Sequence, residues 1–151
     1  MHILLALVGL ATGFVLPTFA QDTVDPKTAQ QIHAFAAKFN QAFNKHDPGA
    51  VAALYTEDAV WDTYHGTFRG RQRIEQVYIE WCFKLWNKHD WTTTIRRMMP
   101  VGNEVRATGF WSCRVRNGSD SGICTWVLVR EGDTWKIRRE TLSSDNWRPG
   151  V

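Results

Sequence analysis

Apolar residues in the first third of the chain recur every three or four positions. This spacing predicts one amphipathic helix that buries a single face. Its apolar positions are Ile32, Phe35, Ala36, Phe39, Ala42 and Phe43. Asp25 and Pro26 supply an N-cap and a proline at the first helical position, and Asp47 and Pro48 repeat this start signal. The sequence therefore predicts a long helix, a tight break and a short second helix.

The pattern changes after residue 58. Residues 59–64 are β-prone and end at a His-Gly turn signal. A third helix is predicted to begin near Gly70, with apolar positions at Ile74, Val77, Tyr78, Trp81, Cys82 and Leu85. Four further strands, separated by turn residues, are predicted at residues 91–99, 104–116, 123–130 and 135–143. Helices first and an antiparallel meander last predict an α+β domain whose curved sheet wraps around the N-terminal helices.

The turn at residues 132–133 predicts the register of the last hairpin. A two-residue loop there places Leu128 opposite Ile137 and Trp126 opposite Arg139. These four residues then share the more apolar face of the sheet, which we expect to turn toward the helices. An arginine on that face needs a partner, because desolvating an unpaired charge costs several kcal/mol. The partner expected for Arg139 is an acidic side chain or an anionic ligand.

A second hairpin, centred between Gly118 and Ser119, predicts how two cysteines face each other. It places Cys113 opposite Cys124, where a disulfide would close a short loop. The alternative is that both are small buried side chains without a bond. The third cysteine, Cys82, lies on the apolar stripe of the third helix and is expected to be inert core. No pair of cysteines or histidines has metal-ligand spacing, so we expect neither a metal nor another cofactor.

The first twenty residues contain no Asp, Glu, Lys or Arg and end in the small-x-small sequence Thr18-Phe19-Ala20. This pattern is typical of a signal peptide that is cleaved before Gln21. We therefore expect residues 1–20 to direct export and residues 21–151 to form one periplasmic or secreted domain. An uncleaved membrane anchor is the alternative, at the short limit for a span. After cleavage, the sequence predicts no membrane association.

The charge pattern argues against nucleic acid as a partner. The net charge is only +3, and the basic residues are spread along the chain rather than gathered in one run. Arg69, Arg71 and Arg73 form a local cluster, which we interpret as the solvated start of the third helix.

Three segments resemble a known superfamily. They are FNQAFNKHDPGAVAALYTEDAVWDTYHGTFRG at residues 39–70, the residues 71–78 that follow, and the strand WKIRRETLS at residues 135–143. Together they resemble the nuclear transport factor 2-like superfamily, and within it the SnoaL-like and ketosteroid-isomerase-like group of small bacterial proteins. The resemblance implies a cone-shaped roll with a pocket between the curved sheet and the helices. It also implies a homodimer through the outer sheet face, where we expect Phe110 and Ile123.

The residues that the isomerases of this group use are replaced in this chain. The isomerases carry a tyrosine on the first helix, where this chain has Phe39, and a general-base aspartate at the end of the first strand, where it has Thr63. Their second acid lies on a central strand, and no carboxylate occurs here between Ile123 and Arg130. Proton abstraction beside a carbonyl needs a base and a donor for the enolate oxygen. An isomerase reaction would therefore require other residues.

Two residues of the segment WDTYHG are the candidates for acid–base catalysis. His65 has a reference pKa of about 6.5, close to neutral pH, and Asp62 is a carboxylate three positions before it. The simpler interpretation is a turn histidine and an aspartate that pairs with an arginine. The residues expected to bind a ligand lie in this segment or on the apolar face of the sheet. They are Trp61, Thr63, Tyr64, Phe68, Trp111, Trp126 and Arg139.

Three functions are consistent with these residues. The first is an exported domain that binds a small, partly apolar molecule, which can be anionic, between aromatic walls and Arg139. The second is a cofactor-free SnoaL-like isomerase, lyase or hydrolase that uses Asp62 or His65 for proton transfer. The third is a dimeric structural or partner-binding module without a ligand. An open pocket favours binding or catalysis, and a filled cone favours the module.

Overall fold

Two helices, a short hairpin, a third helix and four long strands follow one another in the computed structural model, which describes residues 23–146. The helices are α1 (Pro26–Asn44), α2 (Pro48–Ala52) and α3 (Arg71–Val77), and α3 continues as the π-helix Tyr78–Leu85. The strands are β1 (Tyr55–Thr63), β2 (Gly66–Arg69), β3 (His89–Val101), β4 (Glu104–Val115), β5 (Gly118–Glu131) and β6 (Thr134–Leu142). The predicted signal peptide at residues 1–20 lies outside the described residues. None of the described helices has the length and apolar character needed to cross a membrane.

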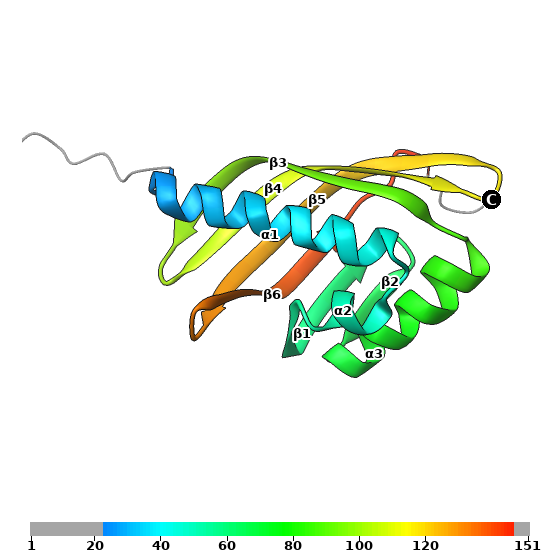
Figure 1. Cartoon of the computed structure of the whole chain (residues 1–151), viewed down its shortest axis with the longest axis horizontal. Coiled ribbons are helices and arrows are strands. Elements are labelled where there is room, and N and C mark those ends of the chain that lie inside the picture. Colours follow the sequence, from blue (N-terminus) through cyan, green and yellow to red (C-terminus); the bar gives the residue numbers. More distant parts are fainter. Residues whose placement is uncertain (1–22, 147–151) are drawn as a thin grey trace, which may run out of the picture.

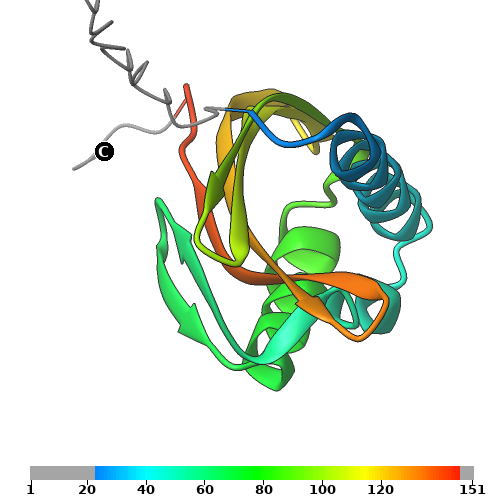
Figure 2. The ribbon, with the colours of Figure 1, turned by 90° about the vertical axis from the view of Figure 1, so that its left-hand side faces the viewer.

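The first two helices form where the sequence predicts them. The Asp25 side chain accepts a hydrogen bond from the backbone N–H of Thr28 at 3.0 Å, and Asp47 accepts one from Ala50 at 2.9 Å. Both aspartates are therefore N-caps. All six predicted apolar positions of α1 are buried. Figure 2 shows α1 lying across the concave side of the curved sheet, and Phe35 and Phe39 of this face pack against Trp126 on β5.

The six strands form one curved sheet in the order β2-β1-β6-β5-β4-β3. Figure 1 shows α1 lying across β3, β4 and β5, and α2 and α3 beside β1 and β2. The α+β class and the curved sheet around the helices are confirmed. The sheet is mixed rather than wholly antiparallel, because β1 pairs parallel with β6. The short strand β2, which the sequence pattern did not predict, extends this side of the sheet by pairing with β1.

Two asparagines fasten α1 to the edge strand β3. The Asn40 side chain donates to the Thr93 carbonyl at 3.2 Å and accepts from the Thr93 N–H at 2.9 Å. Asn44 makes the same pair of bonds with Trp91, at 2.9 and 2.6 Å. These side chains satisfy backbone groups that an edge strand leaves without a strand partner. The helix therefore covers the edge of the sheet as well as its concave face.

The register of the β4–β5 hairpin differs from the prediction by four residues. The loop consists of residues 116–117, so Cys113 lies opposite Asp120, and Cys124 lies opposite Gly109. The predicted Cys113–Cys124 disulfide is therefore wrong, and all three described cysteines are free and buried. A shift by an even number of residues leaves each side chain on its predicted face, because side chains alternate along a strand. The buried face was thus predicted correctly although the pairing was not.

The last hairpin follows the predicted register only near its turn. Leu128 lies opposite Ile137 as predicted, but a bulge follows, and Trp126 then lies opposite Glu140. Because the bulge adds one residue to β6, every later side chain changes face. Arg139 is exposed and Glu140 is buried. The prediction that Arg139 points into the cone is therefore wrong.

Candidate functional site

An open cleft lies at the end of the sheet that carries the β4–β5 hairpin. The turn after β1 contributes Tyr64 and His65, and the end of the π-helix contributes Leu85 and Trp86. The opposite wall comes from the hairpin and from the segment after β6. Its residues are Val115, Arg116, Asn117, Ser119, Asp120, Ser144 and Asn146. The cleft has a volume of about 550 Å³, which is enough for a small organic molecule.

A smaller cavity lies inside the cone and shares a wall with the cleft. Tyr64, His65 and Trp86 line both spaces. The other lining residues of the cavity are Phe43, Trp61, Thr63, Phe68, Val77, Tyr78, Trp81, Cys82, Lys88 and Trp91. Its volume of about 20 Å³ holds about one water molecule. Aromatic side chains therefore fill most of the cone, which is the outcome that favours the module without a ligand. The larger free space, which a ligand could occupy, lies outside the shared wall, in the cleft.

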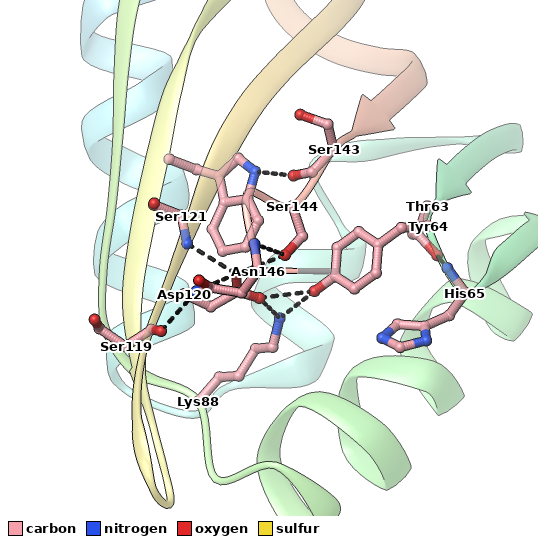
Figure 3. A network of polar contacts seen from close by, with 11 residues as sticks. Thr63, Tyr64, His65, Lys88, Ser119, Asp120, Ser121, Ser143, Ser144 and Asn146 are labelled. Carbon is pink, nitrogen blue, oxygen red and sulfur yellow. Dashed lines mark hydrogen bonds and ion pairs between the residues drawn. The ribbon is translucent and has the colours of Figure 1, made fainter. Parts of the chain in front are cut away.

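A buried lysine lies behind this wall. Lys88 lies shortly after the π-helix, which ends at Leu85, and only 5% of its surface is exposed. Its Nζ donates a hydrogen bond to the Tyr64 hydroxyl at 3.1 Å and lies 3.9 Å from a carboxylate oxygen of Asp120. Figure 3 shows the ammonium group pointing toward both residues. The chain thus places a positive charge at the junction of cleft and cavity.

Aromatic rings surround the Lys88 ammonium. The Nζ lies 5.1 Å from the ring centres of Trp86 and Trp111, 5.8 Å from that of Tyr64 and 5.9 Å from that of Trp91. A cation within about 6 Å of an aromatic face is attracted by the ring quadrupole. Trp91 and Trp111 are themselves stacked, with ring centres 4.8 Å apart. These four rings form the aromatic cage of Lys88.

Asp120 joins the cleft to the cage. Its carboxylate accepts hydrogen bonds from the Tyr64 hydroxyl at 3.0 Å, the Ser144 hydroxyl at 2.7 Å and the Ser121 N–H at 2.9 Å (Figure 3). Burial and the negative charge of Asp120 raise the pKa of Tyr64 above its usual value. The hydroxyl therefore stays protonated. It donates a hydrogen bond to Asp120 and accepts one from Lys88.

His65 stands in the shared wall, between the cleft and the cage. Its ring stacks on Trp86, with ring centres 4.6 Å apart, and packs against Tyr64. Burial and the nearby Lys88 charge lower the pKa of His65 below its usual value, so the imidazole is neutral at neutral pH. Of the two catalytic candidates, His65 lines both spaces.

Asp62 forms its hydrogen bonds outside the cleft and the cavity. Its carboxylate accepts from the Arg139 Nε at 2.8 Å and from the Thr67 hydroxyl at 2.7 Å. Partial burial alone raises the pKa of Asp62, but the hydrogen bonds from Thr67 and Arg139 outweigh this effect and lower it. Asp62 and Arg139 therefore form the ion pair that the simpler interpretation predicts. Neither residue lines the cleft or the cavity.

The remaining sequence-predicted ligand residues divide between the cavity wall and the core. Trp61, Thr63 and Phe68 line the cavity together with Tyr64. Trp111 and Trp126 are fully buried. The Trp111 indole N–H donates to the Ser143 carbonyl at 2.9 Å while its ring faces Lys88. Trp126 packs against α1 and hydrogen-bonds to Glu140.

Glu140 is a buried carboxyl group, whereas strict alternation with Arg139 on the inner face would place it on the outer face. It accepts from the Trp126 indole N–H at 2.8 Å and from the Tyr55 hydroxyl, which lies 2.7 Å from the Tyr78 hydroxyl. Burial raises the pKa of Glu140 to about 7, although both hydrogen bonds counteract this rise. The sequence contains one indication that Glu140 is buried. The adjacent arginines 138 and 139 can both reach solvent only if the strand bulges at this point, and the bulge turns Glu140 inward.

Lys88 and Asp120 were not among the predicted site residues. Lys88 lies in the polar sequence Asn-Lys-His-Asp, which is typical of an exposed loop, and Asp120 lies in a turn signal. No residue pattern within either segment shows that they meet. Within residues 23–146, no three His, Cys, Asp or Glu side chains gather in a way that could hold a metal ion.

Comparisons with known proteins agree with this fold. The family model for the SnoaL-like domain matches residues 36–139. No functionally curated protein has a matching sequence. A Nostoc punctiforme protein of unknown function with a cystatin-like fold is 13% identical, with a TM-score of 0.70 over 85% of this chain and 99% of its own.

Two further solved structures carry functional names. A ketosteroid isomerase-like protein from Erwinia carotovora atroseptica is 18% identical, with a TM-score of 0.68 over 82% of this chain and 100% of its own. A hexachlorocyclohexane dehydrochlorinase is 16% identical, with a TM-score of 0.65 over 83% of this chain and 96% of its own. At these identities the likeness establishes the fold alone. With the matched family model, it shows that the chain belongs to the SnoaL-like domain family, of nuclear transport factor 2-like and ketosteroid-isomerase-like fold.

Proposed function

We propose that the protein is an exported domain that binds a small, flat, partly apolar molecule in the open cleft, with a hydrogen-bond acceptor of the ligand directed at Lys88. The observation that carries the proposal is the buried ammonium group at the junction of cleft and cavity. An ammonium has three donor hydrogens, and the described residues accept one hydrogen bond from the Lys88 Nζ, at the Tyr64 hydroxyl. The anchor is therefore Lys88 rather than Arg139, which lies outside the cleft.

The polar groups around the cavity favour an acceptor on the ligand. The Trp61 indole N–H is buried and has no hydrogen-bond partner among the described residues. Asp120, the carboxylate of the cleft nearest Lys88, already accepts from Tyr64, Ser121 and Ser144. A carboxylate or carbonyl oxygen of a ligand matches free donors better than another donor does. Once His65 has moved, the face of Trp86 on which it stacks offers a flat apolar surface for the rest of the molecule.

Access to Lys88 requires His65 to turn aside. His65 is exposed, lies in the turn between β1 and β2, and is placed by stacking on Trp86. The body of the ligand then occupies the cleft, and its acceptor end replaces the imidazole in front of the cage. This arrangement needs no opening of the tightly packed core around α1.

Titration of tryptophan fluorescence with naphthalene-2-carboxylate tests the proposal. We expect saturable quenching, weaker binding of the matching carboxamide, and no saturable binding of naphthylmethylammonium. Lys88→Met should weaken carboxylate binding at least about tenfold, because a hydrogen bond to a charged group contributes about 1.5–3 kcal/mol. Near-UV circular dichroism of the variant checks that the cage still packs.

Lys84→Met is the matched control. Lys84 is an exposed lysine of the π-helix, so this variant removes the same charge from the same region but leaves the cage intact. We expect it to bind the carboxylate as the wild type does. Equal losses in the two variants would show that general charge, rather than the cage, attracts the ligand. Absence of saturable binding to the wild-type protein would refute the proposed class of ligand.

A further inference from the structure

Lys88 has the surroundings of a reactive amine as well as those of an anchor. Its Nζ is buried among four aromatic rings and opens toward a cavity with room for about one water molecule. A lysine amine in a water-poor pocket attacks carbonyl carbons once it has lost its proton. Such chemistry at Lys88 requires a route for that proton and a site that stabilises the product.

A relay of two hydrogen bonds leads the proton away. Lys88 donates to the Tyr64 hydroxyl at 3.1 Å, and Tyr64 donates to a carboxylate oxygen of Asp120 at 3.0 Å. Tyr64 can therefore accept a proton from Lys88 while it passes its own to Asp120. The three groups lie on different elements, the exit of the π-helix, the turn after β1 and the strand β5, so the relay exists only in the folded chain.

The cage suits the product as well as the starting ammonium. An amine and a carbonyl compound give an iminium ion, which carries the same single positive charge as a protonated lysine. The four rings and the carboxylate of Asp120 then attract this cation as they attract the ammonium. The reaction thus begins and ends with a cation in the cage.

We propose that Lys88 captures small aromatic aldehydes or ketones as a covalent iminium adduct in this site. The inference rests on the proposed function in one respect, since the carbonyl compound must enter through the same cleft. The Lys88 nitrogen forms a bond to the carbonyl carbon, and the carbonyl oxygen leaves as water with two hydrogens of the original ammonium. The third hydrogen stays on the iminium nitrogen, so no net proton is gained or lost.

Reductive trapping tests the proposal on the wild-type chain. The protein is incubated with benzaldehyde and sodium cyanoborohydride, which reduces an iminium to a stable secondary amine, and the modified lysine is identified by peptide mass spectrometry. We expect saturable labelling of Lys88 ahead of the exposed Lys38 and Lys84. Naphthalene-2-carboxylate should protect Lys88 and leave the other two unchanged. Labelling of the exposed lysines without Lys88 would overturn the proposal.

Two variants separate reactivity from structure. Lys88→Arg keeps the charge in the cage but removes the primary amine, so the saturable adduct should disappear while the thermal midpoint stays close to the wild-type value. Tyr64→Phe interrupts the relay, so trapping at Lys88 should slow at neutral pH and recover as the pH rises and solvent removes the proton instead. A rate in Tyr64→Phe that equals the wild-type rate at every pH would exclude the relay.

The two experiments can refute the covalent proposal and the binding proposal separately. If the carboxylate binds in a Lys88-dependent way but no adduct forms at Lys88, the proposed binding function holds and the covalent step is refuted. If an adduct forms at Lys88 but the carboxylate does not bind, the covalent step holds and the non-covalent binding of a carboxylate at Lys88 is refuted.

Discussion

At the scale of single residues, Glu140 makes the stability of the fold depend on pH. It is 1% exposed, and burial raises its pKa from an ordinary value of 4.5 to about 7 in the folded protein. A group whose pKa is raised by folding stabilises the folded state below its unfolded pKa and loses that contribution as the pH rises through the folded value. We expect the free energy of unfolding to fall by on the order of 3 kcal/mol between pH 4.5 and pH 8 from this residue.

Urea unfolding at a series of pH values measures this effect. In Glu140→Gln the amide stays neutral at every pH, so most of the loss between pH 4.5 and pH 8 should vanish. The amide keeps an acceptor for Tyr55 or Trp126, which limits the structural cost of the change. If the free energy of unfolding of Glu140→Gln had the same pH dependence as that of the wild type, other groups would cause the loss of stability. The pKa of Glu140 would then not be raised by folding.

At the scale of elements, the sequence predicts helices and faces better than it predicts strand register. The six buried positions of α1 follow from spacing alone, because one helical face meets the sheet. The β4–β5 register does not follow from spacing. Turn residues run from Asn117 to Asp120, so the sequence is compatible with a loop at residues 116–117 and with one centred between Gly118 and Ser119. The bulge in β6 also escapes a strict alternation pattern. At the bulge, the consecutive residues Arg138 and Arg139 are both exposed, which regular alternation does not allow.

The register of the β4–β5 hairpin predicts three free thiols. Cys113 and Cys124 lie opposite Asp120 and Gly109, so the backbone would have to slide by four residues before their sulfurs could meet. Burial raises the pKa of Cys113 to about 11 and that of Cys124 to about 12, so both stay protonated and slow to oxidise. Thiol titration of the unreduced protein in denaturant should count three thiols. A count of one would restore the disulfide and contradict this register.

At the scale of the whole molecule, half of the site could be predicted from the sequence. Tyr64 and His65 stand out because they lie where the first strand ends, at the mouth of the expected cone. Lys88 and Asp120 meet these two residues only because the exit of the π-helix and the β4–β5 hairpin reach the same end of the sheet. That meeting depends on the register and on the path of α3, and neither leaves a local pattern in the sequence.

The outer face of the sheet carries the last prediction. Phe110 on β4 and Ile123 on β5 lie opposite each other, and 56% and 48% of their surfaces are exposed. Neighbouring exposed apolar side chains on one face often mark a contact between proteins. We propose that two copies of the chain pair through this face. Phe110→Glu should then convert a dimer into a monomer in light scattering coupled to size-exclusion chromatography, because the pairing would bury two charges.

Leu85→Glu provides the comparison for this experiment. Leu85 is as exposed as Phe110 but lies on the π-helix beside the cleft, so the same substitution there should leave the dimer intact. Ligand binding supplies a second measurement, because the cleft and the outer face lie on different sides of the sheet. The Phe110→Glu monomer should therefore bind naphthalene-2-carboxylate as the wild type does. A wild-type protein that is monomeric at micromolar concentration would rule out this interface, and the binding proposal would stand without it.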